Sequence, residues 1–356
     1  MPDWTASMQQ TFEFYIVDPK SWKNVSKLDN VLSCSIDWDS EADTLGSATL
    51  DVDANISENY IRIYLVTIQN GVTEKFTLGT FLVQTPTEDF DGLSPSISLD
   101  AYTPLLELTE NYPDFGYFVP KKENVMRWVS NLAQQNMRAP VIKETGNDIT
   151  LTMNYVADPS KTWLVFLKEL ASNANFIFKL DEEGQVYFSP KRDLDSLQPI
   201  WTFNDDNSSI LYPDVSKSQD LFGIPNVVEV LCSTNNESGS AIHVVVENND
   251  INSKTSIQSR GRRITHRVTD PEIIGTANYD RVKEYAENLL KELSTVECTI
   301  SYTHAYCPVK VGDCVRLNYE KAGLNGVKAK IISQSINCVP GCPVTEVAVY
   351  TTKYWR

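Results

Sequence analysis

The first part of the chain, up to about residue 102, alternates hydrophobic and polar residues, and this pattern predicts β-strands. It is clearest in residues 12–17, 60–66, 79–83 and 96–101. Asn70-Gly71 and Asp91-Gly92 fall between such runs, and both pairs tolerate the positive φ angles of tight hairpin turns. We therefore expect an antiparallel barrel or sandwich in this segment.

After Pro104 the hydrophobic residues take the spacing of amphipathic helices. Asn124 is a suitable N-cap for a first helix, and Asp158 followed by Pro159 suits the start of a second. The residues at i, i+3, i+4, i+7 and i+8 are Val125, Trp128, Val129, Leu132 and Ala133 in the first helix, and Trp163, Phe166, Leu167, Leu170 and Ala171 in the second. Residues 176–180 and 185–188 then predict a hairpin, and we expect a solvated or turn-forming role for its acidic tip at 181–183.

The strand pattern returns from Trp201 and continues to the end of the chain. It is clearest in residues 227–231, 242–246, 298–302, 311–317, 328–332 and 347–350. One helix interrupts it, with Val282, Tyr285, Ala286, Leu289, Leu290 and Leu293 on one face. We expect no membrane span, because no hydrophobic run approaches the ~18 residues that one needs.

These patterns together predict an α+β, mainly β fold. It has two barrel-like antiparallel β domains and small α+β inserted domains. The expected boundaries are residues 1–105 for an acidic β domain, 106–200 for a small α+β domain with two amphipathic helices, and 201–356 for a second β domain with a helical insert at about 255–294.

The net charge of −16 is distributed unevenly along the chain. Residues 1–105 contain 16 acidic and 5 basic residues, whereas residues 106–356 contain 31 and 26. Several of the early carboxylates alternate with hydrophobic residues, as a half-buried strand with one polar face requires. A strongly negative face is therefore expected in the first domain, and tight binding of nucleic acid is disfavoured.

The sequence lacks the short motifs of common enzyme sites. There is no GxGxxG, no GxxxxGK[ST] and no GxSxG, so dinucleotide, nucleoside-triphosphate and α/β-hydrolase sites lack support. His243, His266 and His304 show no HExxH and no i, i+4 pairing for zinc. We expect structural histidines, no cofactor and no enzymatic activity.

Paired carboxylates leave one enzymatic alternative open, because a glycosidase needs two opposed acids. Asp205 and Asp206 lie in a polar segment where a turn-forming role is favoured. The alternative is a hydrolase of peptidoglycan or cell-wall polysaccharide, and Asp205, Asp206 and Glu229 are the residues to test.

The cysteines favour folding in a reducing cytoplasm, because they are odd in number and thinly spread, at positions 34, 232, 298, 307, 314, 338 and 342. Cys307, Cys314, Cys338 and Cys342 are weak candidates for a metal site. Cys338 and Cys342 flank a Pro-Gly turn, across which two thiols can meet as ligands or as a small disulfide. We expect small buried hydrophobic residues, with metal binding and a disulfide as open alternatives.

One basic cluster stands against the general acidity. It consists of Arg260, Arg262, Arg263 and Arg267. Few aromatic residues lie between these arginines, so carboxylates of a neighbouring subunit are favoured over nucleic acid as their partners. We predict a subunit interface here.

The order of the parts and several stretches resemble the hub proteins of tailed-phage tail tips and contractile baseplates. The stretches are residues 60–65, 78–83, 99–108, 222–230 and 311–317. They are similar to the tail-associated hub, or amino-terminal tail-lysin, family of siphophages of Gram-positive hosts. The resemblance covers nearly the whole chain.

The resemblance implies a homotrimer whose two barrel-like domains per chain form a pseudo-sixfold ring. Such a ring matches a sixfold tail above and a threefold tip below, and it conducts DNA during ejection. The implied partners are the distal tail protein, other tail-tip proteins, the tape-measure protein and DNA in passage without tight binding. The implied location is the virion tail tip, after assembly in the host cytoplasm. The chain ends soon after a β run, so we expect no appended lytic domain.

Under this interpretation the channel-facing candidates are Asp37, Asp39, Asp51 and Asp53, since a negative wall repels phosphate. A host-glycan-binding module remains a further alternative. It would use the aromatic residues Tyr112, Phe115, Tyr117 and Phe118, which we interpret as hinge or packing residues.

Overall fold

The computed structural model describes residues 1–354 except 55, 91–94, 144–145, 147–148, 207–208, 234–239 and 272–277. The chain folds as two compact units, and each is described by itself. The first comprises Met1–Val215 and Tyr302–Ala348, and the second Ser216–Ser301 and Val349–Arg356. The three-part division expected from the sequence stays a prediction.

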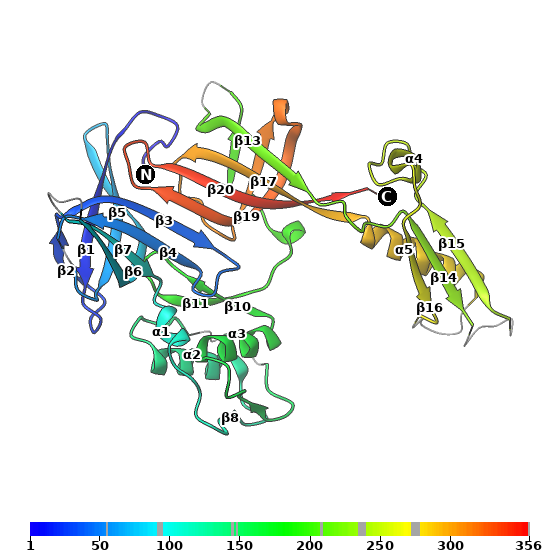
Figure 1. Ribbon diagram of the computed structural model, residues 1–356, viewed down its shortest axis with the longest axis horizontal. Coiled ribbons are helices and arrows are strands. Elements are labelled where there is room, and N and C mark those ends of the chain that lie inside the picture. Colours follow the sequence, from blue (N-terminus) through cyan, green and yellow to red (C-terminus); the bar gives the residue numbers. More distant parts are fainter. Residues whose placement is uncertain are drawn as a thin grey trace. The chain divides into compact units, whose positions relative to one another are not determined.

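The fold is mainly β, as predicted, with 46% of the residues in strands and 16% in helices. The first strands are β1 (Gln9–Val17), β2 (Asn24–Leu28), β3 (Val31–Asp39), β4 (Gly46–Val52), β5 (Tyr60–Gln69), β6 (Val72–Phe90) and β7 (Pro95–Tyr102). Neighbours in the sheet pair antiparallel in the order β3-β4-β7-β6-β5-β1-β2. The predicted strands in this region are confirmed (Figure 1).

Asn70 and Gly71 form the tight turn between β5 and β6, with φ angles of 52° and 78°. Both values are positive, as a two-residue hairpin turn requires, so this prediction is confirmed. The turn predicted at Asp91-Gly92 lies outside the described residues.

The later strands extend the same sheet rather than forming a second barrel. They are β12 (Trp201–Asn204), β13 (Leu211–Gln219), β17 (Thr295–Ala305), β18 (Cys314–Tyr319), β19 (Leu324–Asn337) and β20 (Pro343–Lys353). The sheet runs in the order β13-β17-β20-β19-β3, and β12 pairs parallel with β18 at its side. Over the described residues the strand order has two open ends, so the barrel-like β domains expected from the sequence are not closed barrels.

The part of the chain between the two groups of strands forms a small helical region, drawn at the bottom of Figure 1. It contains α1 (Leu106–Thr109), β8 (Phe118–Val119), α2 (Val125–Asn136), β9 (Tyr155–Val156), α3 (Trp163–Asn173), β10 (Phe176–Leu180), β11 (Val186–Pro190) and the 3-10 turn η1 (Leu194–Ser196). A second 3-10 turn, η2 (Glu320–Ala322), follows β18.

The start of α2 agrees with the prediction and the start of α3 does not. Asn124 caps α2 by accepting a hydrogen bond from the Arg127 amide. For α3 the cap is Thr162, four residues after the predicted Asp158. The Asp158 carboxylate instead accepts hydrogen bonds from the amide and hydroxyl of Ser160, which stabilises a local turn.

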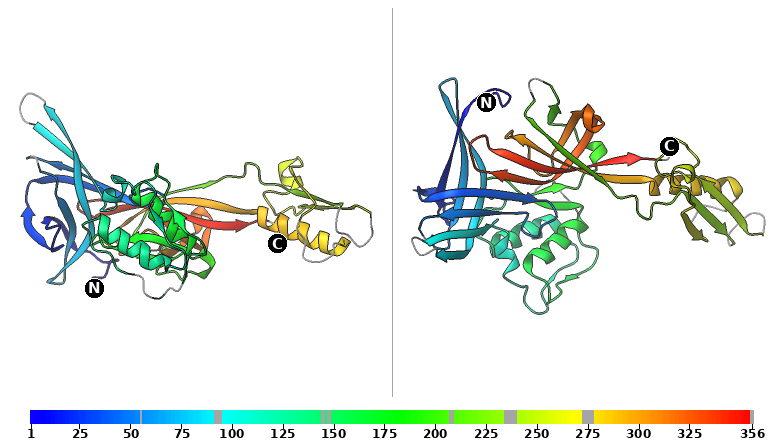
Figure 2. Two further views of the ribbon diagram at one scale, coloured as in Figure 1. Left: turned by 90° about the horizontal axis from the view of Figure 1, so that it is seen from below. Right: turned by 45° about the horizontal axis from the view of Figure 1, so that its top comes forward.

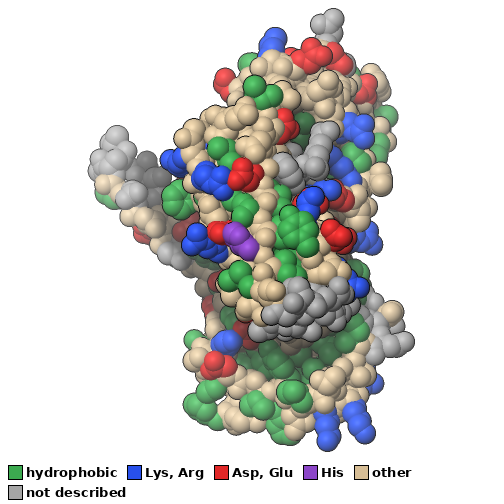
Figure 3. Space-filling model, turned by 90° about the vertical axis from the view of Figure 1, so that its right-hand side faces the viewer, with side chains coloured by type: hydrophobic (Ala, Val, Ile, Leu, Met, Phe, Trp, Pro, Cys, Tyr) green, Lys and Arg blue, Asp and Glu red, His purple; other side chains and the backbone are tan. Residues whose placement is uncertain are grey.

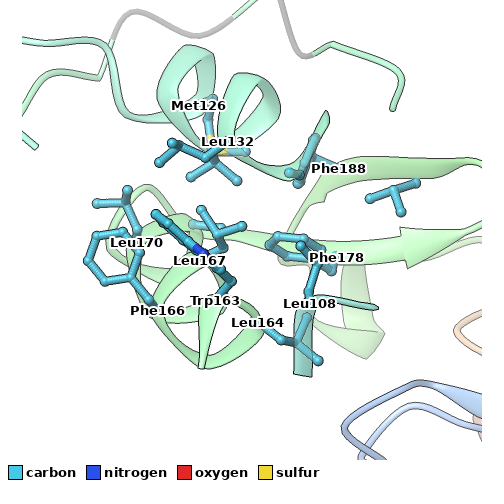
Figure 4. Packing of buried hydrophobic residues seen from close by; sticks show 14 of the residues in the cluster. Leu108, Met126, Leu132, Trp163, Leu164, Phe166, Leu167, Leu170, Phe178 and Phe188 are labelled. Atoms are coloured by element: carbon cyan, nitrogen blue, oxygen red, sulfur yellow. The ribbon is translucent and has the colours of Figure 1, made fainter. Parts of the chain in front are cut away.

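The two helices pack on each other and on the hairpin β10–β11 through a hydrophobic core. In Figure 4, Met126 and Leu132 of α2 face Leu167 and Leu170 of α3, while Phe178 lies on the hairpin beside them. The rings of Phe178 and Phe188 are in edge contact at 4.9 Å. The helical stripes predicted from the sequence are therefore core positions.

Replacing Leu167 with Ala is expected to lower the free energy of unfolding by about 3 kcal/mol, because its fully buried side chain would leave a cavity. Phe115→Ala is the matched control, since Phe115 is 93% exposed, and it should change stability by less than about 0.5 kcal/mol. Urea unfolding of the two variants measures both effects. Equal losses would contradict this description of the core.

The acidic hairpin tip forms a turn, as predicted, since the Asp181 carboxylate accepts a hydrogen bond from the Gln185 amide at 2.7 Å. The tip is docked rather than solvated. The Arg62 guanidinium lies 2.7 Å from the Glu183 carboxylate and also donates to the Glu183 carbonyl at 3.0 Å. Thr80 donates to the Glu182 carbonyl, and burial raises the pKa of Asp181. Gly184 has a φ of +78°, and a Cβ there would lie 3.0 Å from Thr80, so the docked tip requires glycine.

The second unit contains β14 (Val227–Cys232), β15 (Ile242–Glu247), β16 (Thr265–Thr269), α4 (Ile257–Arg260) and α5 (Tyr279–Leu293). The sheet order is β15-β14-β16, with β14 antiparallel to β15 and parallel to β16. Helix α5 lies along this sheet and buries Val282, Ala286 and Leu290 against it (Figure 2). Among the described residues no helix is long and apolar enough to cross a membrane.

Candidate functional site

Four aspartates share one face of the large sheet. Asp37 and Asp39 lie on β3, Asp51 on β4 and Asp100 on β7. Residues directly opposite each other on adjacent strands point to the same side, and so do residues two apart on one strand. The register therefore places these four side chains together, and their cross-strand partners are Ser335, Ser47, Ser333, Ser33, Ser98 and Thr49. We call this surface the acidic sheet face.

The opposite side of the same strands is hydrophobic. Ile36, Leu50 and Leu99 are fully buried, as the alternation along each strand requires. Asp53, the remaining channel-facing candidate, follows the end of β4 and is exposed. The structure thus brings Asp37, Asp39 and Asp51 onto one face and adds Asp100, which the sequence analysis missed because only the register of β7 shows it.

The acidic sheet face carries no compensating positive charge. β3, β4 and β7 contain no Lys, Arg or His. Within the described part of the chain, no basic side chain forms an ion pair with these four aspartates or with Asp53. Hydroxyl groups are their neighbours instead, since Ser33 donates to Asp51 at 2.5 Å and Thr49 to Asp100 at 3.4 Å. The face therefore presents like charges to its surroundings.

The arginines predicted at a subunit interface lie in the second unit, where three of them have partners within the same chain. Arg260 donates to the backbone carbonyls of Leu221 and Ile224. Arg263 pairs with Glu247, and Arg267 with Glu229. Arg262 has an exposed side chain. The interface itself stays a prediction.

The exposed face of the sheet β15-β14-β16 carries mixed charges. Glu229 lies between Arg267 and His243, with its second carboxylate oxygen 2.9 Å from the histidine ring. These contacts hold the pKa of Glu229 below its usual range, Arg267 contributing most. Figure 3 shows basic, acidic and histidine side chains close together, with hydrophobic ones between them, on the face turned toward the viewer.

The cysteine candidates do not assemble a metal site. Cys307, Cys314 and Cys342 are buried, and Cys338 is partly buried, all four as free thiols. No cluster of three or more His, Cys, Asp or Glu side chains suited to a metal ion exists in the part of the chain that the structure describes. Burial raises the pKa of the Cys307 thiol, as expected for a small hydrophobic residue in a core.

The residues named for the hydrolase and glycan-binding alternatives do not form a common site among the described residues. Asp205 and Asp206 are exposed in the first unit, and Glu229 belongs to the second. Of the four aromatic residues, Tyr117 packs on Trp163 at 5.1 Å, in agreement with a packing role. Tyr112, Phe115 and Phe118 are exposed, which does not fit a packing role, and a hinge role for these three stays a prediction.

A fully buried polar cluster is the main feature that the sequence did not reveal. Glu346 on β20 accepts hydrogen bonds from the Tyr302 hydroxyl at 2.5 Å and the Gln334 side chain at 2.8 Å. His304 Nε2 lies 3.3 Å from Glu346 Oε1, and His304 Nδ1 donates to the Ala305 carbonyl at 2.7 Å. His304 and Glu346 are wholly shielded from solvent, so this cluster is part of the core rather than a site.

Comparisons with known proteins find relatives by structure only. No protein-family model matches the sequence, and no curated protein matches it. The crystal structure of a tail protein from Neisseria meningitidis MC58 has a TM-score of 0.60 and 12% identity, covering 97% of this chain and 98% of that one. The 43 kDa tail protein of prophage MuSo2 from Shewanella oneidensis has a TM-score of 0.59 and 11% identity, covering 95% and 98%.

A third solved structure extends the likeness beyond phages. An E. coli protein described as a component of the type VI secretion system, with structural similarity to T4 bacteriophage tail proteins, has a TM-score of 0.51 and 8% identity, covering 92% of this chain and 75% of that one. The chain thus has the fold of phage and prophage tail proteins, and the predicted resemblance is confirmed at the level of the fold. The three proteins are described as tail proteins or as a secretion-system component.

Proposed function

We propose that this chain is a structural hub of a phage tail tip or baseplate. Three copies assemble into a ring that adapts a sixfold tail to a threefold tip, and the ring conducts DNA during ejection. Its partners are the distal tail protein, other tail-tip proteins and the tape-measure protein, and its place is the virion. The fold of tail proteins supports this role, and the acidic sheet face is the observation that carries it.

The physical argument concerns the passage of a polyanion. A wall that carries carboxylates without neighbouring cations repels phosphate, so DNA slides past it without binding. In a ring of three copies the acidic sheet face lines the central channel and repeats its charge around the axis. The subunit interfaces of this ring include the arginine cluster, with Arg262 available to a neighbouring copy.

The assembly is tested by mass photometry and light scattering of the purified chain, which should show a particle of three times 40.1 kDa, alone or after addition of tail partners. A particle that stays monomeric at micromolar concentration with every tail partner present would overturn the hub.

The channel is tested by reversing the charge of the acidic sheet face. A variant with Asp37, Asp39, Asp51 and Asp100 changed to Lys should bind duplex DNA roughly 100-fold more tightly than the unchanged protein at low salt. The matched control makes the same charge change at exposed carboxylates elsewhere in the first unit, namely Asp29, Glu58, Asp193 and Asp214. Electrophoretic mobility shifts measure both, and equal binding by the control would contradict a channel lined by this face.

A further inference from the structure

The pairing of β3 with β19 is the seam of the large sheet. Over the described residues it is the strand pairing that connects β1–β7 with the later strands. The ladder runs over five pairs, from Ser333 opposite Asp39 to Asn337 opposite Ser35. We call this ladder the seam.

Two cysteines meet at the end of the seam. Cys338 continues the register after Asn337, and its amide donates to the Cys34 carbonyl at 3.0 Å. Residues directly opposite in an antiparallel pair have Cα atoms about 4.5–5.5 Å apart, within the span of about 4.4–6.8 Å that a disulfide bridges. The Cys34 thiol is the largest cause of the raised pKa of Cys338, in agreement with two neighbouring thiol groups.

We propose that Cys34 and Cys338 form a redox-sensitive cross-link that locks the seam. The oxidant is a small-molecule disulfide such as glutathione disulfide. The Cys338 thiolate attacks one of its sulfur atoms, the S–S bond breaks, and one glutathione thiolate leaves. The Cys34 thiolate then attacks the Cys338 sulfur of the mixed disulfide and releases the second glutathione. The protein loses two protons and two electrons, and the glutathione disulfide is reduced.

The exposure of the two thiols sets this order of events. Cys338 is partly exposed and reaches an oxidant in solution, whereas Cys34 is 3% exposed and needs to reach only Cys338. Contact with the Cys34 thiol, and then burial, raise the pKa of Cys338, so little thiolate is present at neutral pH. The pair therefore reacts slowly with an oxidant. It stays reduced where a cytoplasm keeps glutathione reduced, and it closes once an oxidising medium surrounds the protein. We expect faster closure at pH 9 than at pH 7.

Cys342 is the competing partner, because it is the thiol that the sequence places nearest to Cys338. It is fully buried, and it follows a turn in which its amide donates to the Val339 carbonyl at 2.8 Å. The two possible disulfides connect different parts of the fold. A Cys34–Cys338 bond links two strands across the seam, whereas a Cys338–Cys342 bond only closes a turn.

Tryptic mapping separates these pairings. Residues 28–62 contain only Cys34, and residues 331–353 contain both Cys338 and Cys342. The folded protein is treated with glutathione disulfide at pH 9, alkylated, digested without reductant and analysed by mass spectrometry. We expect the two peptides to be joined in the unchanged protein and in Cys342→Ser, and to be separate in Cys338→Ser.

Thermal unfolding shows whether the bond locks the seam. Oxidation should raise the Tm by about 5 °C or more, and dithiothreitol should reverse this rise. Cys342→Ser should keep the rise, and Cys338→Ser should lose it. The proposal would be overturned by a disulfide within residues 331–353, or by a disulfide between two molecules. It would also be overturned if the peptides stayed separate after exhaustive oxidation, or if they were joined without a rise in Tm. These readouts need no tail partner or DNA, so they are independent of the proposed hub.

Discussion

Replacing Arg62 with Met is expected to lower the free energy of unfolding by about 3 kcal/mol. The Arg62 side chain is almost fully buried and holds the hairpin tip through the Glu183 carboxylate and carbonyl, while it donates to the Thr80 hydroxyl at 2.9 Å. Met fills much of the same volume and makes none of these hydrogen bonds. The hairpin of the helical region would then lose its main polar attachment to β5 and β6.

Arg127→Met is the matched control for this prediction. Arg127 also pairs with a glutamate, Glu123 at 2.6 Å, but on an exposed helix surface. An exposed pair of this kind contributes about 0.3–0.5 kcal/mol. Urea unfolding monitored by tryptophan fluorescence measures both variants, and a similar small loss in each would show that the docked tip adds little stability.

Replacing His304 with Phe is the second large effect expected, a loss of about 2–3 kcal/mol in the free energy of unfolding. The variant keeps an aromatic ring against Phe203, whose ring lies 4.7 Å from that of His304. It removes the ring nitrogen Nε2, which lies 3.3 Å from Glu346 Oε1, and leaves the buried Glu346 side chain with two hydrogen-bond donors, Tyr302 and Gln334. A polar group in the core that loses a polar neighbour is destabilising, because no solvent replaces the lost contact.

A second substitution tests whether the contact with Glu346 causes this loss. Glu346→Gln in the His304→Phe background removes the carboxylate and still hydrogen-bonds Tyr302 and Gln334. The double variant should therefore be more stable than His304→Phe alone, by about 1–2 kcal/mol. Calorimetry or urea unfolding of the four proteins in the cycle gives the coupling. Additive losses would mean that packing, and not the contact with Glu346, makes His304 important.

The local structure was largely predictable from the sequence. The spacing of Val125, Val129 and Leu132 identified α2, and Asn124 identified its first turn, because these signals depend on residues within one or two turns. Asp158 misled the prediction of α3, since Asp also stabilises turns and Thr162 is the actual cap. The choice between two capable residues depends on where the preceding chain packs.

The long-range contacts were not predictable. Arg62 donates a hydrogen bond to the Glu183 carbonyl, although the two residues are 121 positions apart in the sequence. No local pattern near either residue predicts this contact. Similarly, the Pro-Gly turn directed attention to Cys342 as the partner of Cys338, whereas the register of β3 with β19 brings Cys34 there. Sequence pattern fixes which face a side chain occupies but not which strand lies beside it.

The acidic sheet face was predictable from the sequence only in part. Alternation placed Asp37, Asp39 and Asp51 on the polar face of their strands, and the structure agrees. Asp100 required the pairing of β4 with β7. Whether the strands close into a barrel depends on the pairing of the end strands, about which the pattern along each strand contains no information.

The seam also determines how the chain must fold as it is synthesised. β3 leaves the ribosome early, but its partner in β19 begins to emerge only some 294 residues later, from Asp39 to Ser333. At bacterial or eukaryotic rates of elongation this delay lasts roughly 15 to 60 seconds. Throughout it one edge of β3 has unpaired backbone groups, which invite association with other nascent chains. The interval between translation of these two strands is therefore the period in which a chaperone is most useful to this protein.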